Sequence, residues 1–326
     1  MTTHIWTRTL IGAVLAGWIA MVPPGAALAS DKIPDQYPGS VLYSKPVEVI
    51  PNVWSAIGAT APPRYENAGH NNNLSFIVTG DGVVVVNAGG SYLLARALHD
   101  EIRQVTEQKV KLVICENGQG HAMLGNSYWA EQSIPILAHV DAVEAFEESA
   151  PQSLSRLQRI VKERAEGTTI VQATETFEDE KIIEMGNFRI EVRNLGPAHS
   201  PGDTSVFLPK QSLVIAGDMA FHERLLPIFD DTITGEWLET WDNEFEALKA
   251  TYVIPGHGHP TNMAQVRRYT KDYLVHLRGK IREHMDNGGT LENAYYVDQS
   301  PFRHLDTFKE LATRNAGRVY VEMEFE

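Results

Sequence analysis

Short apolar segments that end at glycine-flanked polar loops are the feature that most constrains how this chain folds. Leu74–Val78 and Val83–Val86 have the pattern of buried strands joined by the turn Thr79-Gly80-Asp81-Gly82. Three later apolar runs of strand length are each followed by an acidic residue or a histidine, at once or within three residues: Val110–Cys115, Leu213–Ala216 and Tyr252–Ile254. Loops at strand ends carry most functional sites, so the chemistry of this chain is expected there.

Helical stretches alternate with these strands. Shorter strands are predicted at 47–50, 53–57, 134–138, 170–171, 181–184, 188–194 and 205–208, and helices at 92–107, 125–133, 141–166 and from 263 to about 315. The alternation predicts an α/β fold. The chain has no internal repeat or low-complexity linker, which favours one compact domain.

Charge and cysteine content exclude several classes of protein. The 326 residues carry 28 basic and 42 acidic side chains, a formal net charge of −14. Such a chain repels phosphate backbones, so nucleic acid is not an expected partner. Cys115 is the single cysteine, which excludes an internal disulfide framework and an all-cysteine metal site. Cys115 itself is predicted to be buried in the core.

Residues 1–29 have the pattern of a cleaved secretory signal. Arg8 precedes an apolar run of 13 residues, Leu10–Val22, and Ala27-Leu28-Ala29 is a small-x-small cleavage site. The run is short for a membrane span, although an uncleaved anchor is the alternative. We therefore expect cleavage after Ala29 and a periplasmic or secreted protein without a membrane span.

Four polar positions stand out as candidates for chemistry. They are His121 in a loop that begins at Glu116, His199 in GPAHSPGDT, Asp218 after Gly217, and His257 in PGHGH. Each alone has an ordinary structural explanation, such as a turn residue or a helix cap. The occurrence of all four residues at strand ends indicates a metal centre, because imidazole and carboxylate ligands suit zinc, iron or manganese.

The order of these motifs resembles the metallo-β-lactamase fold superfamily. The carriers are GDGVVVVNAG at 80–89, GPAHSPGDT at 196–204, Gly217-Asp218, and PGHGH at 255–259. The resemblance implies a four-layer αββα sandwich over residues 30–262 with a metal site at one edge of its two sheets. Residues 263–326 would then form a helical extension packed on the same domain.

The chain departs from the family at its defining loop, His-x-His-x-Asp-His. Here that loop reads Glu116-Asn117-Gly118-Gln119-Gly120-His121, so only the final histidine matches. By resemblance, Asp218 would bridge two metal positions, with His199 and Glu116 at one and His121 and His257 at the other. One or two zinc ions are expected, with iron, manganese or no metal as alternatives. Glu116→His, Gly118→His and Gly120→Asp together are expected to raise zinc affinity.

The resulting functional prediction is an exported metallohydrolase. A metal-activated water would attack a small ester, lactone, thioester or related molecule, with Asp218 and His121 at the catalytic centre. Four further residues are predicted to contact the substrate: His70, Gln119, His222 and His259. The alternatives are a non-catalytic binding or accessory protein that has lost its metal, and a redox protein with a single iron.

Overall fold

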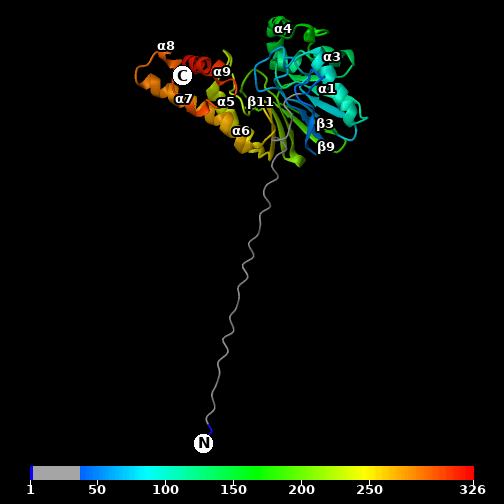
Figure 1. Ribbon diagram of the computed structural model, residues 1–326, viewed down its shortest axis with the longest axis horizontal. Coiled ribbons are helices and arrows are strands. Elements are labelled where there is room, and N and C mark those ends of the chain that lie inside the picture. The colour runs from blue at the N-terminus through cyan, green and yellow to red at the C-terminus, as the bar shows by residue number, and fades with distance from the viewer. Residues whose placement is uncertain (3–36) are drawn as a thin grey trace.

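The computed structural model describes residues 1–2 and 37–326 (Figure 1). The predicted signal peptide therefore lies, apart from its first two residues, outside the described residues. Within the described part of the chain, no helix is long and apolar enough to cross a membrane.

Two β-sheets form the centre of the molecule. The first contains seven strands in chain order, β1 to β7; β1–β4 pair antiparallel, and β4–β7 pair parallel. The second contains five strands in the order β12-β11-β10-β9-β8, with β11 and β12 parallel and the other pairs antiparallel. The strands are β1 Val47–Ile50, β2 Val53–Ala56, β3 Leu74–Val78, β4 Val83–Val86, β5 Val110–Ile114, β6 Ile136–His139, β7 Glu175–Phe177, β8 Glu180–Met185, β9 Phe188–Arg193, β10 Ser205–Leu208, β11 Leu213–Phe221 and β12 Tyr252–His257.

Helices cover both outer faces of this pair of sheets. The α-helices are α1 Tyr92–Val105, α2 Gly120–Met123, α3 Asn126–Glu131, α4 Val140–Val161, α5 Thr234–Thr240, α6 Met263–Tyr269, α7 Lys271–Asp286, α8 Leu291–Ala294 and α9 Phe308–Glu324. Short 3₁₀ turns lie at Lys162–Ala165, Pro209–Gln211, Glu246–Leu248 and Ser300–Phe302, and a π-helical turn lies at Trp241–Phe245. In Figure 1, α1, α3 and α4 lie on one side of the sheets and α5–α9 on the other.

Three hydrophobic clusters correspond to the three interfaces between these layers. Apolar side chains such as Val84 and Ile254 fill the space between the sheets. Leu98 of α1 and Phe146 of α4 belong to the cluster on the outer face of the first sheet. A third cluster joins Phe221 of β11 to helices α5, α7 and α9. Burial on both faces explains why the strands are almost continuous apolar runs. The predicted αββα sandwich with extra C-terminal helices is confirmed.

The C-terminal helices share the third cluster with the second sheet. Leu277 of α7 and Val319 of α9 are fully buried in it, together with Trp237 of α5. Asn315 of α9 adds a polar link, because its Nδ2 donates to the Leu226 carbonyl at 2.7 Å and its Oδ1 accepts from the Ile228 N–H at 3.0 Å. These bonds fix α9 against the segment that follows β11.

The structure differs from the sequence prediction at two strands. Ile170-Val171 is not a strand; the edge strand is β7, five residues later, where the Thr174 N–H already donates to the Ile136 carbonyl. The predicted strand Leu213–Ala216 continues to Phe221 as β11. Its pairing with β12 is irregular around Gly217, which has a φ of +59°. Asp218 therefore lies within a distorted strand and not after its end.

His70 ties the N-terminal segment to the loop before β3. It is fully buried, and its Nδ1 accepts the Tyr43 N–H at 2.8 Å. Burial lowers the pKa of His70 to about 4, because the cationic form loses its hydration.

Replacing His70 by Gln is expected to flatten the pH dependence of stability. In the unfolded chain a histidine takes up a proton below about pH 6.5, whereas the folded protein does not until about pH 4, so stability falls over that window as pH drops. We expect the free energy of unfolding of H70Q to lose on the order of 2 kcal/mol less than wild type between pH 7 and pH 5. Urea denaturation at the two pH values measures this. The exposed variant H304Q is the control, and a wild-type-like loss in H70Q contradicts the prediction.

Candidate metal site

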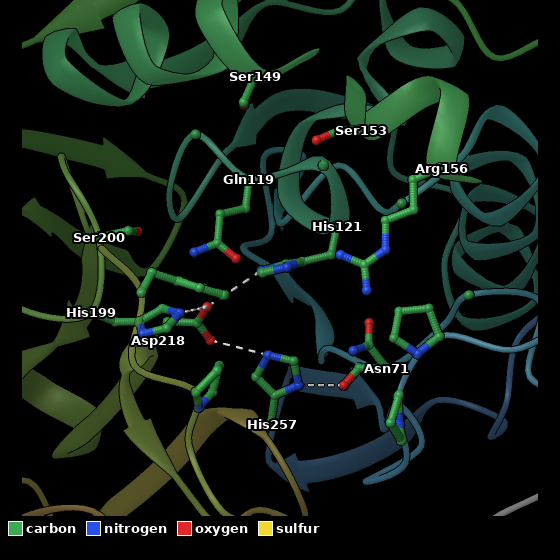
Figure 2. Close-up of a pocket in the computed structure, with 18 of the residues that line it drawn as sticks. Asn71, Gln119, His121, Ser149, Ser153, Arg156, His199, Ser200, Asp218 and His257 are labelled. Atoms are coloured by element: carbon green, nitrogen blue, oxygen red, sulfur yellow. Dashed lines mark hydrogen bonds and ion pairs between the residues drawn. The ribbon is translucent and has the colours of Figure 1, made fainter. Parts of the chain in front are cut away.

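Four of the five predicted ligand residues, His121, His199, Asp218 and His257, lie around one cavity (Figure 2). Asp218 lies on β11 and His257 ends β12, while His121 lies on the short helix α2. Glu116 follows β5, and His199 lies in the loop between β9 and β10. The five come from four segments, because Glu116 and His121 share the stretch after β5; β11 and β12 run parallel, so their two candidate ligands reach the same edge.

His121, Asp218 and His257 form a compact group. One potential ligand atom from each lies within 4.8 Å of the others, and no other such group of three occurs among the residues that the structure describes. His257 Nε2 is 3.2 Å from Asp218 Oδ1, and His121 Nε2 is 3.5 Å from Asp218 Oδ2. Two imidazoles and a carboxylate around one point are a donor set that binds zinc or another divalent transition metal.

Two glycines make room for the carboxylates of the site. A Cβ on Gly256 would lie 2.4 Å from Asp218 Oδ1, and a Cβ on Gly217 would lie 2.8 Å from Glu116 Oε2. Gly217 also has a positive φ, which side chains rarely adopt. The glycines next to the predicted ligands are thus required by the close approach of acidic side chains.

The orientation of His257 is set by its other nitrogen. Nδ1 forms a short hydrogen bond with the Asn71 carbonyl, so Nδ1 carries the proton and donates. The Nε2 lone pair then faces Asp218 and is free to bind a metal. The ring also stacks on Phe221, with centroids 5.1 Å apart and an interplanar angle of 8°.

The charges of the site stabilise one another. Burial opposes ionisation of Asp218, but His257 and His121 outweigh this effect and hold its pKa well below the usual range; at neutral pH the positive charge beside it is that of His121. Burial likewise opposes protonation of His121, while the negative charges of Asp218 and Glu116 raise its pKa overall. Burial lowers the pKa of His257 to about 4, against the attraction of Asp218. His257 is therefore a neutral imidazole at neutral pH, as metal ligation requires.

His199 lies at the periphery of the compact group. Its Nε2 is 3.7 Å from Asp218 Oδ2, and its ring contacts three aromatic side chains, Phe221, Phe229 and Trp237. It is 1% exposed, and burial lowers its pKa to about 4. His199 Nδ1 has no hydrogen-bond partner among the described residues.

Glu116 lies beside His121. Its Oε1 is 3.2 Å from His121 Nε2, and its backbone N–H donates to Asn87 Oδ1. The carboxylate is 1% exposed, burial raises its pKa, and its Oε2 has no hydrogen-bond partner among the described residues. A buried carboxylate oxygen without a donor is costly, so this atom is suited to a cation.

The remainder of the altered loop occupies the place of the family's missing ligands. Gly118 packs against α4 so closely that a Cβ there would lie 2.3 Å from the Ala142 carbonyl oxygen. Asn117 is buried, and its Nδ2 donates to Asp218 Oδ2 at 3.2 Å. A histidine at position 118 therefore does not fit this backbone. The expected gain in zinc affinity from restoring the family loop is not supported by this geometry.

A cavity of about 550 Å³ opens onto the compact group. Gln119, predicted to contact substrate, lines it together with His121, His199, Asp218 and His257 (Figure 2). Its wall includes apolar side chains of α4 and of the segment after β11, such as Leu157, Ile160 and Phe229. The site is thus accessible to a small organic molecule.

The other three predicted substrate residues lie away from this cavity. His70 is buried behind it and bonds to the Tyr43 backbone. His222 Nδ1 contacts the His259 carbonyl at 2.8 Å, and His259 Nδ1 lies 2.6 Å from Glu223 Oε2. His222 and His259 thus hold two loops together.

Several residues of the site are absent from the sequence-based prediction. Asn73 donates from Nδ2 to the carbonyls of Pro255 and Gly258, which fixes the His257 loop to the first sheet. Asn71 orients His257, Asn117 contacts Asp218, and Arg224 lines the cavity. The run Asn71-Asn72-Asn73 before β3 is the one signal that could have drawn attention to two of them.

Comparison with known proteins agrees with the fold and the motifs. A family model described as the metallo-beta-lactamase superfamily matches residues 123–257, which begin just after the altered loop. A metallo-beta-lactamase from Pontibacter korlensis is similar in structure with a TM-score of 0.58 and 17% identity, over 71% of this chain and 98% of that one. The DIM-1 metallo-beta-lactamase gives 0.56 and 18%, over 71% and 96%.

A longer enzyme also aligns with the chain. The sec-alkylsulfatase Pisa1 from Pseudomonas sp. has a TM-score of 0.65 and 17% identity, over 84% of this chain and 49% of that one. No match was found among curated proteins. The chain therefore has the metallo-β-lactamase fold, and its sequence is similar to that superfamily over residues 123–257.

Replacing Gly118 by Ala is expected to lower the free energy of unfolding by about 1–3 kcal/mol, because the added methyl overlaps the α4 backbone. Gly279 is the matched control, since it is exposed on α7 and a Cβ there meets nothing within 4 Å. G279A is expected to raise the free energy of unfolding by about 0.5–1 kcal/mol through its better helix propensity. Chemical denaturation of both variants after chelation checks this; an unchanged G118A contradicts the described packing.

Proposed function

We propose that this chain is an exported metallohydrolase that works with one divalent metal ion, zinc being the expected ion. His121, Asp218 and His257 would hold it. The substrate would be a small ester, lactone, thioester or related molecule bound in the cavity. Iron and manganese suit the same donors. Export rests on the sequence pattern of residues 1–29.

The observation that carries the one-metal proposal is the packing of the altered loop. The loop supplies no side chain at Gly118, and its Asn117 already donates to the Asp218 oxygen that faces away from His257. His199 and Glu116 remain as donors on that side, but they do not join a compact group of three. His121, Asp218 and His257 keep a compact set of two imidazoles and a carboxylate.

Three protein ligands and an open position are the pattern of catalytic zinc sites. When bound there, the ion would lower the pKa of a water molecule and polarise a substrate oxygen. The protein's own residues orient the ligands and shape the cavity. The Asn71 carbonyl fixes the tautomer of His257, and the Glu116 carboxylate holds His121 in place. Apolar residues of the cavity wall restrict the access of water to the bound substrate.

Metal analysis and a substrate screen test this proposal. Protein exported to the periplasm and purified without chelator is expected to contain about one equivalent of zinc, iron or manganese. It should hydrolyse at least one compound from a panel of 4-nitrophenyl esters, lactones and thioesters, and it should lose that activity on chelation. A folded protein that stays empty when zinc is added contradicts the proposal and supports a non-catalytic binding protein.

Asp218→Ala and His257→Ala are expected to reduce bound metal to about a tenth or less, because each removes one of three ligands. Gln119→Ala is the matched control; it lines the same cavity but lies outside the compact group, so its metal content should equal that of wild type. Elemental analysis of the three variants measures the difference. Equal metal in wild type and Asp218→Ala excludes the ligand assignment, and two equivalents in wild type exclude the one-metal site.

Glu116→Gln keeps the size of the side chain and removes its charge. We expect a loss of metal affinity of about 10- to 100-fold, because Glu116 contacts His121 and its Oε2 has no other partner. Competition with a fluorescent zinc chelator measures the affinity. An unchanged affinity would mean that Glu116 neither binds the ion nor supports His121.

A further inference from the structure

Helix α4 borders the cavity with one continuous side. Its cavity-lining residues recur every three or four positions, which places them along one face of a helix. This face is apolar at both ends, with Ala145 near its start and Leu157 and Ile160 near its end. The middle is polar and is called here the polar face of α4; it consists of Ser149, Gln152, Ser153 and Arg156.

The polar face lies next to the candidate metal ligands. A Cβ on Gly120 would lie 3.1 Å from Ser153 Cβ and 3.5 Å from Ser153 Oγ, so α4 contacts the residue that precedes His121. In Figure 2, Ser149 and Ser153 lie above Gln119 and His121. A molecule with its reactive bond at the compact group can therefore place another part against α4.

The four side chains of the polar face have no partner within the protein. None of them forms a side-chain hydrogen bond or an ion pair with any residue of the ranges 1–2 and 37–326. Ser149 and Ser153 are half-buried, while Gln152 and Arg156 are exposed. The charge of Arg156 is therefore hydrated and requires no anion. The hydrogen-bonding atoms of all four side chains are open to a molecule in the cavity.

Hydroxyl groups are the ligand chemistry that matches this face. A serine hydroxyl and a glutamine amide each donate and accept hydrogen bonds, so three of the four residues carry both functions. A carboxylate or a sulfate can only accept, and an alkyl chain does neither, so each would leave part of the polar face unused. A sugar or another polyol donates and accepts at every hydroxyl.

A second wall of the cavity is apolar. It contains Phe229 from the segment after β11 and Leu311 of α9. Two backbone bonds hold this wall together: the Leu225 N–H donates to the Asp306 carbonyl at 2.8 Å, and the Asp306 N–H donates to the Glu223 carbonyl at 3.1 Å. They attach the segment around Arg224 to the start of α9. A sugar ring also has C–H faces, which pack on apolar and aromatic side chains.

We infer that the polar face of α4 binds a hydroxyl-rich part of the substrate, so that the substrates of this site are esters or lactones of sugars and other polyols. This inference rests on the proposed function, because it names which esters and lactones the hydrolase would accept. Ser149, Gln152 and Ser153 would exchange hydrogen bonds with the hydroxyl groups, and Arg156 would donate to their oxygen atoms.

Isothermal titration calorimetry with nitrophenyl probes tests the binding part of the inference. The probes are 4-nitrophenyl β-D-glucopyranoside, 4-nitrophenyl β-D-galactopyranoside, 4-nitroanisole and 4-nitrophenyl sulfate, which share the ring and differ in the attached group. They are titrated into the full exported chain, zinc-loaded and after chelation. The test variant is Gln152→Ala/Ser153→Ala. The matched control is Ser155→Ala/Gln158→Ala, because both residues are exposed on the same helix and lie outside the cavity lining.

At least one hexoside is expected to bind about tenfold or more tightly than 4-nitroanisole and 4-nitrophenyl sulfate, with or without zinc. Gln152→Ala/Ser153→Ala should weaken hexoside binding about 5- to 100-fold, since each neutral hydrogen bond contributes roughly a factor of 2 to 10, and should leave 4-nitroanisole unchanged. The control should match wild type. The single variant Gln152→Ala is measured as well, because an exposed side chain can be removed without disturbing the packing of α4.

A kinetic comparison tests the substrate class. The zinc-loaded protein is expected to hydrolyse 6-O-acetyl-D-glucose, in which water splits the acyl C–O bond to give glucose and acetate. Its kcat/KM should be about tenfold or more above that for ethyl acetate, because binding of the sugar positions the ester. Gln152→Ala/Ser153→Ala should remove this preference and leave kcat/KM for ethyl acetate unchanged.

Three results would overturn the inference. They are hexosides that bind no more tightly than 4-nitroanisole, a sulfate probe that binds more tightly than the hexosides, and equal losses of all probes in Gln152→Ala/Ser153→Ala. Failure of the proposed function is distinguishable. In that case hexoside binding still depends on the polar face of α4, but the zinc-loaded protein hydrolyses neither acetate ester nor any compound of the panel.

Discussion

The burial of the Asp218 carboxylate is the constraint on which the rest of this structure depends. A carboxylate that is 2% exposed inside a β-sheet needs compensating donors or cations on all sides. His121 supplies a positive charge and Asn117 supplies an amide, while His257 presents its Nε2 lone pair and leaves room for a cation between the two groups. Gly217 and Gly256 are needed because the carboxylates leave no room for a Cβ. The buried negative charge of Asp218 thus accounts for the glycines on β11 and β12. It also accounts for the polar side chains that reach it from the stretch after β5.

The altered loop shows how the residues beside Asp218 can depart from the family's pattern while the fold is retained. Helix α4 packs its backbone onto Gly118, and Asn117 occupies the space beside Asp218. These contacts leave no room for a histidine at position 118. The family match that begins at residue 123 has the same boundary. The candidate ligands on β11 and β12 are held by the sheets. Glu116 and His121 lie in the stretch after β5, where the sequence departs from the family's pattern.

Most of the layer order could be predicted from the sequence, because buried parallel strands give apolar runs with clear ends. The candidate ligands His121, Asp218 and His257 could be predicted to lie together because each is near the end of such a run. The buried position of Arg224 beside His257 could not, since it depends on the contact between the segment after β11 and Asp306. His222 and His259 follow the same local pattern as the candidate ligands, yet their side chains contact neighbouring loops, which only the three-dimensional arrangement reveals. The extension of β11 to Phe221 was not predicted, because Gly217 and Asp218 interrupt the apolar run and glycine is common where strands end. In the structure Gly217 takes a positive φ within the strand.

The two backbone bonds between the Arg224 segment and Asp306 give the C-terminal helices a direct share in the cavity. Leu311 and Arg314 of α9 form part of the same wall. The candidate metal ligands and most of the cavity wall come from the sandwich, while Thr307, Glu310, Leu311 and Arg314 add a short stretch of wall from the C-terminal extension. Substitutions at these four positions would therefore alter one side of the cavity without touching the candidate ligands.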